Sequence, residues 1–133
     1  MKKCLFFIFA VLLVVCVCIL IIVCRERSIP GVKILEIDTN DVSYVKWYGF
    51  NEKEYYINNR EDINNFIETL KNHNYIKKQD NDAEGCYLVE IGCSNGIIDC
   101  GIDDDLFSIN GVQYSLEEGS LSGLTEYMRS KMD

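Results

Sequence analysis

The stretch VEIGCSNGIIDCGI, residues 89–102, alternates apolar residues with polar residues or glycine on both sides of an Asn-Gly pair. Asn-Gly is a strong signal for a two-residue hairpin turn, and a period of two is typical of a strand with one buried face. The sequence therefore predicts a hairpin whose apolar face lies on the core. The pairs predicted by a turn at Asn95-Gly96 are Cys93 with Ile98, Ile91 with Cys100 and Val89 with Ile102.

A second Asn-Gly pair, Asn110-Gly111, lies between two further short apolar stretches. The same reasoning predicts a second hairpin, in which Ile109 faces Val112 and Phe107 faces Tyr114. Earlier in the chain, three more strands are predicted at residues 32–38, 43–48 and 53–57. In the middle one, Val45 and Trp47 are expected on the core face.

Two helices complete the pattern. Asn59 is a suitable N-cap for a helix that ends near Lys71, and acidic residues follow the cap. The apolar residues of this helix recur at the spacing of one buried face. They are Ile63, Phe66, Ile67 and Leu70. A closing helix over residues 120–131 places Leu121, Leu124 and Met128 on one side.

The predicted order of elements after the N-terminal segment is βββα-ββββα. Antiparallel hairpins with two helices laid on the sheet make an α+β domain. Two stretches, INNREDINNFIETL (residues 57–70) and INGVQYSL (residues 109–116), resemble small membrane-anchored extracytoplasmic domains of low-GC Gram-positive bacteria, whose function is undefined. The resemblance covers most of the chain beyond the N-terminal segment and supplies no catalytic residue.

The N-terminal segment CLFFIFAVLLVVCVCILIIVC, residues 4–24, holds 21 residues without a charge. A bilayer core about 30 Å thick requires roughly 20 such residues in a helix, whereas a secretory signal has a shorter apolar core and a small-x-small cleavage site. Ala10 is the only small residue of that kind in the segment. Cys24 follows Ile22-Val23, so the small residue that a bacterial lipidation motif requires is missing. The segment is interpreted as an uncleaved membrane anchor.

The anchor divides the chain into a cytoplasmic stretch of residues 1–3, a span of residues 4–24, a linker of residues 25–31 and one domain of residues 32–133. Basic residues flank both ends of the span, so the charge bias is weak. A Lys-Lys start favours an extracytoplasmic domain in a single-pass protein of the cell membrane. A cytoplasmic domain remains the alternative.

Acidic residues dominate the chain beyond the span. Residues 28–133 hold nine Lys and Arg against twenty Asp and Glu, a formal charge of −11. Such a surface repels nucleic-acid phosphates, so nucleic acid is not expected as a partner.

Two metal sites can be considered. The run Asp80, Asp82, Glu84 and Gly85 matches the first half of a calcium loop, but Ile91 stands where the bidentate Glu belongs. The second candidate is a zinc site of Cys86, Cys93, Cys100 and His73, but these cysteines are seven residues apart and lack a close pair. A weak calcium-responsive module is therefore kept as the alternative function, and no cofactor is expected.

No nucleophile elbow, phosphate loop or HExxH motif occurs, so an enzyme is not expected. Aromatic residues crowd residues 44–56, and half of them must point away from the core face. We expect Tyr44, Tyr48 and Phe50 to point outward, where they would contact a protein or a cell-envelope component unless another helix covers them. The sequence thus predicts a membrane-anchored, non-enzymatic binding domain.

Overall fold

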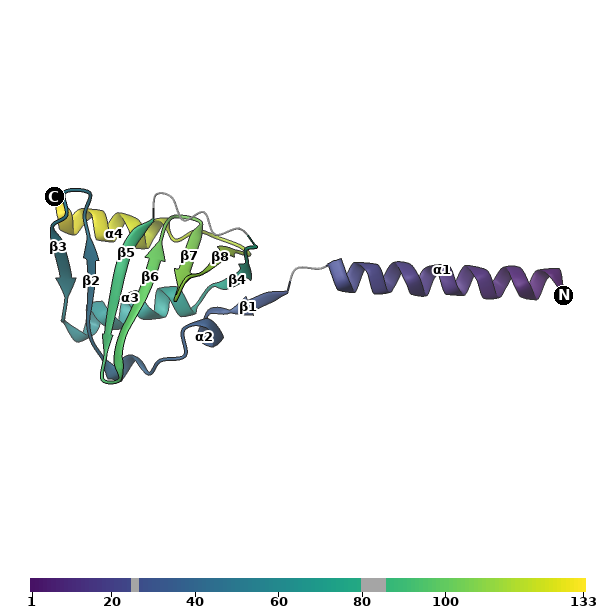
Figure 1. The fold of residues 1–133 in the computed structure, drawn as a ribbon, viewed down its shortest axis with the longest axis horizontal. Helices are drawn as coiled ribbons and strands as arrows, with labels where there is room; N and C mark the ends of the chain where they lie inside the picture. The colour runs from purple at the N-terminus through teal and green to yellow at the C-terminus, as the bar shows by residue number, and fades with distance from the viewer. Residues whose placement is uncertain (25–26, 80–85) are drawn as a thin grey trace.

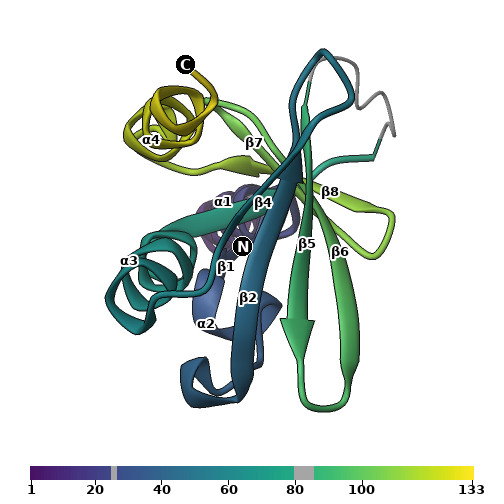
Figure 2. The ribbon, with the colours of Figure 1, turned by 90° about the vertical axis from the view of Figure 1, so that its left-hand side faces the viewer.

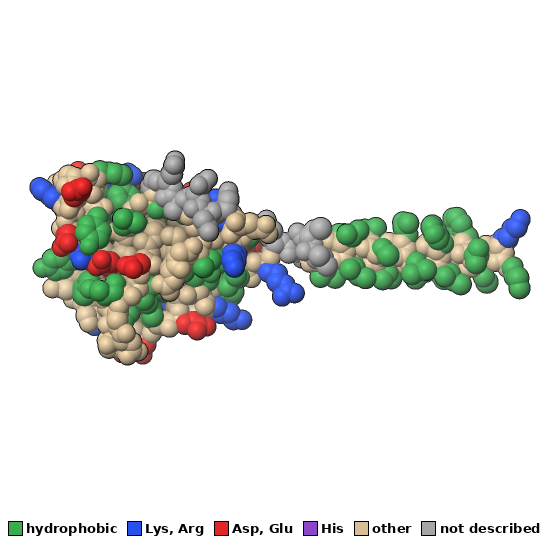
Figure 3. Space-filling model, in the orientation of Figure 1, with side chains coloured by type: hydrophobic (Ala, Val, Ile, Leu, Met, Phe, Trp, Pro, Cys, Tyr) green, Lys and Arg blue, Asp and Glu red, His purple; other side chains and the backbone are tan. Residues whose placement is uncertain are grey.

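The computed structural model describes residues 1–24, 27–79 and 86–133. The N-terminal segment forms one helix, α1 (Lys2–Cys24). Its window Lys2–Ile22 has a mean hydropathy of 3.6 and no buried part, and hydrophobic side chains cover every visible side of it (Figure 3). The helix is therefore long and apolar enough to cross a membrane.

The rest of the described chain forms an α+β domain around an eight-stranded antiparallel sheet (Figure 1). The order of strands across the sheet is β1-β4-β8-β7-β6-β5-β2-β3. The strands are β1 (Ser28–Pro30), β2 (Val42–Tyr48), β3 (Glu54–Ile57), β4 (Asn74–Lys77), β5 (Tyr87–Cys93), β6 (Gly96–Ile102), β7 (Leu106–Ile109) and β8 (Val112–Leu116).

The two main helices, α3 (Arg60–Lys71) and α4 (Ser122–Met132), lie on the same side of the sheet (Figure 2). A short helix α2 (Gly31–Ile34) and a 3-10 turn η1 (Thr39–Asp41) connect β1 to β2. The predicted α+β class with an apolar N-terminal helix is confirmed.

Local sequence explains why α3 forms where it does. The side chain of Asn59 accepts hydrogen bonds from the backbone N–H groups of Glu61 and Asp62, which have no partner inside the helix. Ile63, Phe66, Ile67 and Leu70 are all buried, as their spacing predicts. The helix is therefore fixed at its start by the cap and along its length by one apolar face.

The core lies between the helices and the sheet. Trp47 is fully buried there, with its ring stacked between those of Tyr55 and Phe66 at centroid distances of 6.4 and 6.5 Å. The sheet contributes alternate residues of every long strand, as the period of two predicts. They include Val45, Trp47, Val89, Ile91, Cys100, Ile102, Phe107 and Ile109.

The hairpin at Asn110-Gly111 has the predicted register, with Ile109 opposite Val112 and Phe107 opposite Tyr114. Asn110 and Gly111 both adopt positive φ, 50° and 82°, which is the geometry of a two-residue I′ turn. Here the turn chemistry and the apolar pattern agree.

The predicted register at Asn95-Gly96 is wrong by two residues. Cys93 pairs with Gly96, Ile91 with Ile98 and Val89 with Cys100, so the turn residues are Ser94 and Asn95. A shift of two keeps the same side chains on the core face, which is why the apolar pattern permits either register. The neighbouring strand fixes the choice, because β2 pairs Val42 with Cys93 and the Ser94 N–H donates to the Asp41 carbonyl at 3.2 Å.

The strand predicted at residues 32–38 does not form. Residues 28–30, within the predicted linker, form β1 instead, and the chain then turns into α2. At Gly31 the backbone approaches the last turn of α3 so closely that an added Cβ would lie within 3 Å of the carbonyl oxygens of Leu70, Lys71 and His73. Glycine alone fits this approach.

Strand β4 is absent from the predicted order of elements, and it begins three residues after the end of α3. Its four residues lie between β1 and β8, and Tyr75 is fully buried with its hydroxyl donating to the Leu70 carbonyl at 2.7 Å. The order βββα-ββββα is therefore wrong in two places: the first strand is misplaced, and a strand follows α3.

Candidate binding face

One face of the sheet carries no helix in the described ranges, because α3 and α4 both pack on the opposite face (Figure 2). We call the uncovered surface of β2, β3, β5 and β6 the open face; Figure 3 shows it from the front. The helix that could have covered Tyr44 and Tyr48 is thus not found among the described residues. The side chains of the open face are Tyr44, Lys46, Tyr48, Glu54, Tyr56, Leu88, Glu90, Ile97 and Asp99.

The pairing of the strands arranges these side chains in rows across the sheet. A charged row runs through the middle, since Lys46 pairs with Tyr56 on one side and with Glu90 on the other, and Glu90 pairs with Asp99. Residues directly opposite each other in antiparallel strands have Cβ atoms about 4.5–5.5 Å apart. Register alone therefore brings a lysine next to an acidic residue of the adjacent strand.

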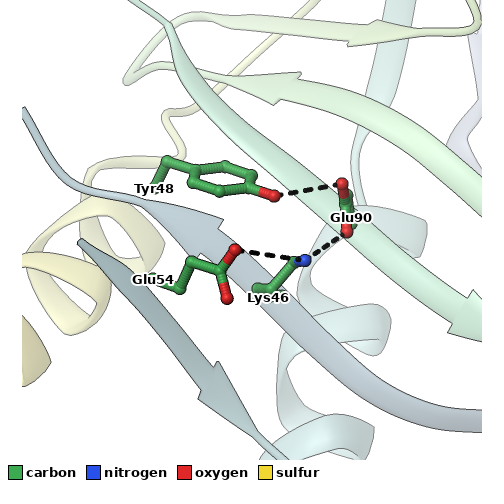
Figure 4. A network of polar contacts seen from close by, with 4 residues as sticks. All are labelled: Lys46, Tyr48, Glu54 and Glu90. Atoms are coloured by element: carbon green, nitrogen blue, oxygen red, sulfur yellow. Dashed lines mark hydrogen bonds and ion pairs between the residues drawn. The ribbon is translucent and has the colours of Figure 1, made fainter. Parts of the chain in front are cut away.

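An ordered polar network forms around Lys46 (Figure 4). Its Nζ lies 2.8 Å from Glu90 Oε2 and 3.8 Å from Glu54 Oε1. The Tyr48 hydroxyl donates to Glu90 Oε1 at 3.2 Å, and the Lys46 ammonium lies 5.2 Å from the centroid of the Tyr48 ring. Three strands thus meet in one network on the open face.

The network changes the acid–base properties of its members. The hydrogen bond from Lys46 lowers the pKa of the Glu90 carboxyl below its ordinary value. The same contact, followed by the one with Tyr48, raises the pKa of Lys46. Both shifts reflect stabilisation of the charged forms, so the ion pair persists at neutral pH, although an ion pair at the protein surface contributes little stability.

Large apolar side chains border the charged row. The exposed fractions of Tyr56, Leu88 and Ile97 are 65%, 64% and 59%. Tyr44 lies half-buried across Gly92, where an added Cβ would overlap its ring. The open face therefore combines an aromatic and aliphatic border with a fixed set of charges.

The predicted contact residues fall in two places. Tyr44 and Tyr48 both lie on the open face, on either side of Lys46 in β2. Phe50 lies instead in the loop between β2 and β3, is 85% exposed, and its ring centroid is 5.5 Å from that of Tyr87. The structure thus places the two tyrosines on the same face of β2, with Lys46 between them, and leaves Phe50 outside that face.

Sequence reasoning missed Tyr56, Leu88 and Ile97 as members of this face. The signal that could have found them is the alternation of side chains along a strand, which puts residues two apart on the same face. Tyr56 lies two residues after Glu54, and Leu88 lies two residues before Glu90. Using it requires knowledge of which strands are neighbours, because a one-residue change of register moves every side chain to the other face.

An acidic hollow of about 210 Å³ lies at the turn between β5 and β6, and Ile97 of the open face is among its lining residues. Glu36, Asp38 and Asp41 line it together with Cys93. Burial and the nearby Asp41 carboxylate raise the pKa of the Cys93 thiol, which makes this sulfur a poor nucleophile at neutral pH. The hollow can attract cations but offers no activated group.

A second hollow, of about 290 Å³, lies between α3 and α4. Phe66 and Leu124 line its apolar part, and Asp62, Thr69 and Tyr127 are among its polar lining residues. The hydroxyl oxygen of Tyr127 is buried and has no hydrogen-bond partner in the described chain. Burial, with a smaller contribution from Asp62, raises the pKa of this phenol, so it stays protonated as a potential donor.

The residues of the considered zinc site do not come together. The His73 ring nitrogen Nδ1 lies 2.7 Å from the Thr69 carbonyl oxygen near the end of α3. Cys86 lies beside Gly101, whereas Cys100 is buried on the core face. Cys93 is half-buried at the end of β5. Within the described ranges, no three His, Cys, Asp or Glu side chains are grouped to hold a metal ion.

The predicted calcium ligands Asp80, Asp82 and Glu84 lie outside the described residues. The calcium loop therefore stays a prediction from sequence.

Comparison of the chain with protein-family models, with curated proteins and with solved structures gives no match. The proposal that follows therefore depends on the geometry of the open face.

Proposed function

We propose that this chain is a membrane-anchored, non-enzymatic module that binds a protein or a cell-envelope component through its open face. In this proposal α1 holds the chain in the cell membrane and the domain lies outside the cytoplasm. The length and hydropathy of α1 support the anchor, since it could cross a bilayer without exposing a polar side chain to lipid.

The observation that carries the proposal is the composition of the open face. An antiparallel sheet with one solvated face normally presents polar side chains to water. Here Tyr56, Leu88 and Ile97 occupy outward positions and are each more than half exposed. Exposed apolar groups that border fixed polar groups are typical of surfaces that bind other molecules.

The charged row supports a binding role rather than a catalytic one. Lys46 and Glu90 neutralise each other, and the pKa shifts of both groups stabilise their charged forms. A general acid or base would need a pKa shifted toward neutrality instead. The row is suited to orienting a partner by charge.

Site-specific photocrosslinking in intact cells tests the proposal. A benzophenone amino acid replaces Leu88 or Ile97 on the open face, and Glu126, an exposed residue of α4, in the control. We expect the same crosslinked adduct from both open-face positions and none from position 126. Adducts that form equally from all three positions would contradict the proposal.

Two further experiments test the compartment of the domain and the alternative calcium-responsive function. Protease added to intact cells should digest the domain while the fragment containing α1 stays with the membrane; full protection would place the domain in the cytoplasm. Millimolar calcium should produce neither heat nor a thermal shift with the full chain. A saturable calcium signal would favour the calcium-responsive module instead.

A further inference from the structure

The open sheet has two free edges, and they differ. β1 forms the edge nearest the anchor, has only three residues and ends at Pro30, which has no N–H to donate. β3 forms the opposite edge, has no proline, and pairs with β2 without a bulge. Natural proteins commonly protect an edge by shortness, proline or a bulge. Of these, β3 has only its short length.

Backbone geometry shows which groups β3 presents at its edge. The Gly49 N–H donates to the Lys53 carbonyl at 3.0 Å, which makes this the first hydrogen-bonded pair of the hairpin. Such pairs alternate in antiparallel strands, so the N–H and C=O groups of Glu54 and Tyr56 point away from β2. In the described chain, no hydrogen bond outside the strand ladders uses these groups.

Side chains at this edge define the chemistry of an added strand. Lys46 is closer to Glu90 than to Glu54, so the Glu54 carboxylate keeps acceptor capacity for a second cation. Tyr56 is exposed next to it, while Tyr55 and Ile57 point toward the core side. An added strand would thus place basic side chains beside Glu54 and apolar ones beside Tyr55.

We infer that the β3 edge binds an extended basic segment of a partner protein, which adds to the sheet as a ninth, antiparallel strand. This inference rests on the proposed binding function and specifies its mode. Charge favours a different protein over a second copy of this chain, because residues 28–133 carry a formal charge of −11 and two such domains repel each other. Main-chain hydrogen bonds would supply affinity and alternate side chains specificity.

Two isomeric peptides test the inference on the full chain in micelles of a neutral detergent. Both are acetyl-KVKVKV-amide, one N-methylated at the backbone of its three lysines and the other at that of its three valines. A peptide lysine directly opposite Glu54 forms a hydrogen-bonded pair with it, so the backbone N–H of that lysine points at β3. Methylation of the lysines should therefore weaken binding about tenfold or more relative to methylation of the valines. Equal affinities would show attraction by charge alone and overturn the inference.

Amide hydrogen exchange locates the bound peptide. Addition of the valine-methylated peptide should slow exchange at Glu54 and Tyr56 about tenfold or more, because their N–H groups gain acceptors. Protection confined to other strands would overturn the edge assignment. Protection at the same amides without peptide, together with a dimer in sedimentation, would show that a second copy is the occupant and would also overturn it.

A matched pair of variants provides the last arm. Tyr56→Pro removes an edge-facing N–H without breaking the ladder to β2, whereas Tyr56→Ala keeps that N–H. Binding should fall at least about tenfold more for the proline variant. If the proline variant does not fold, the affinities of the two peptides for the unchanged chain still test the inference. Failure of the peptides would leave the crosslinks from positions 88 and 97, and with them the proposed function, unaffected.

Discussion

Trp47 and Tyr48 are neighbours in β2, yet they belong to different surfaces. The Trp47 ring is fully buried between Tyr55 and Phe66, whereas Tyr48 is half-buried and donates to Glu90 on the open face. Parity along one strand thus separates a residue that holds the fold from one that is available for contact. Substitutions on the two faces should therefore differ sharply in their effect on stability.

The largest difference is expected from Trp47→Ala against Tyr48→Ala. Removal of the buried indole leaves a cavity in the core and should lower the free energy of unfolding by about 3–5 kcal/mol. The Tyr48 change should cost less than about 1 kcal/mol, since its ring lies at the surface. Urea unfolding of the full chain in detergent, followed by circular dichroism, measures both. Equal losses would show that the open face is part of the core.

Gly92→Ala tests how closely the open face is packed at one point. A Cβ at this position would overlap the Tyr44 ring, so the variant should lose about 1–3 kcal/mol of unfolding free energy. The matched control is the double variant Tyr44→Ser with Gly92→Ala, in which the added methyl should cost much less than it does alone. An equal cost in both backgrounds would mean that Tyr44 does not lie across Gly92.

Asn59→Ala tests the helix that covers the core face. The Asn59 side chain accepts from Glu61 N at 2.8 Å and from Asp62 N at 3.4 Å, so its loss should lower stability by about 1 kcal/mol. Asn65→Ala, on the exposed side of the same helix, serves as the control and should be nearly neutral. Equal effects of the two changes would contradict the cap.

The smallest effect is expected from pH on the open face. Because the folded pKa of Glu90 lies below its ordinary value of 4.5, the unfolded chain takes up this proton first as the pH falls. The contribution of Glu90 to stability is complete above pH 4.5 and is lost as the pH falls through the folded pKa. Melting temperatures from about pH 6 to about pH 3 should therefore converge for the unchanged chain and Glu90→Gln.

If the melting temperatures of the unchanged chain and Glu90→Gln differed by the same amount at every pH, the Lys46 contact would not control the titration of Glu90. Lys46→Met provides the matching control, since it removes the cation and should weaken the same pH dependence.

Elements with local signals could be predicted from the sequence. Asn59 and the apolar face of α3 define that helix, and Asn110-Gly111 fixes its hairpin because both turn residues adopt positive φ. Parity also assigned Val45 and Trp47 to the core. Of the predicted contact residues, Tyr44 and Tyr48 are on the open face for the same reason. Each of these results depends on residues close together in the chain.

Tertiary contacts decided the remainder. A shift of two residues at Asn95-Gly96 buries the same side chains, so the choice falls to the pairing of β5 with β2. β1 and β4 are too short to be recognised alone. They form because each supplies backbone partners that the other lacks, although 43 residues, Gly31 to His73, separate them in the sequence. The open face exists for a related reason. Strand neighbours and helix placement, which no short stretch encodes, determine which outward side chains stay uncovered.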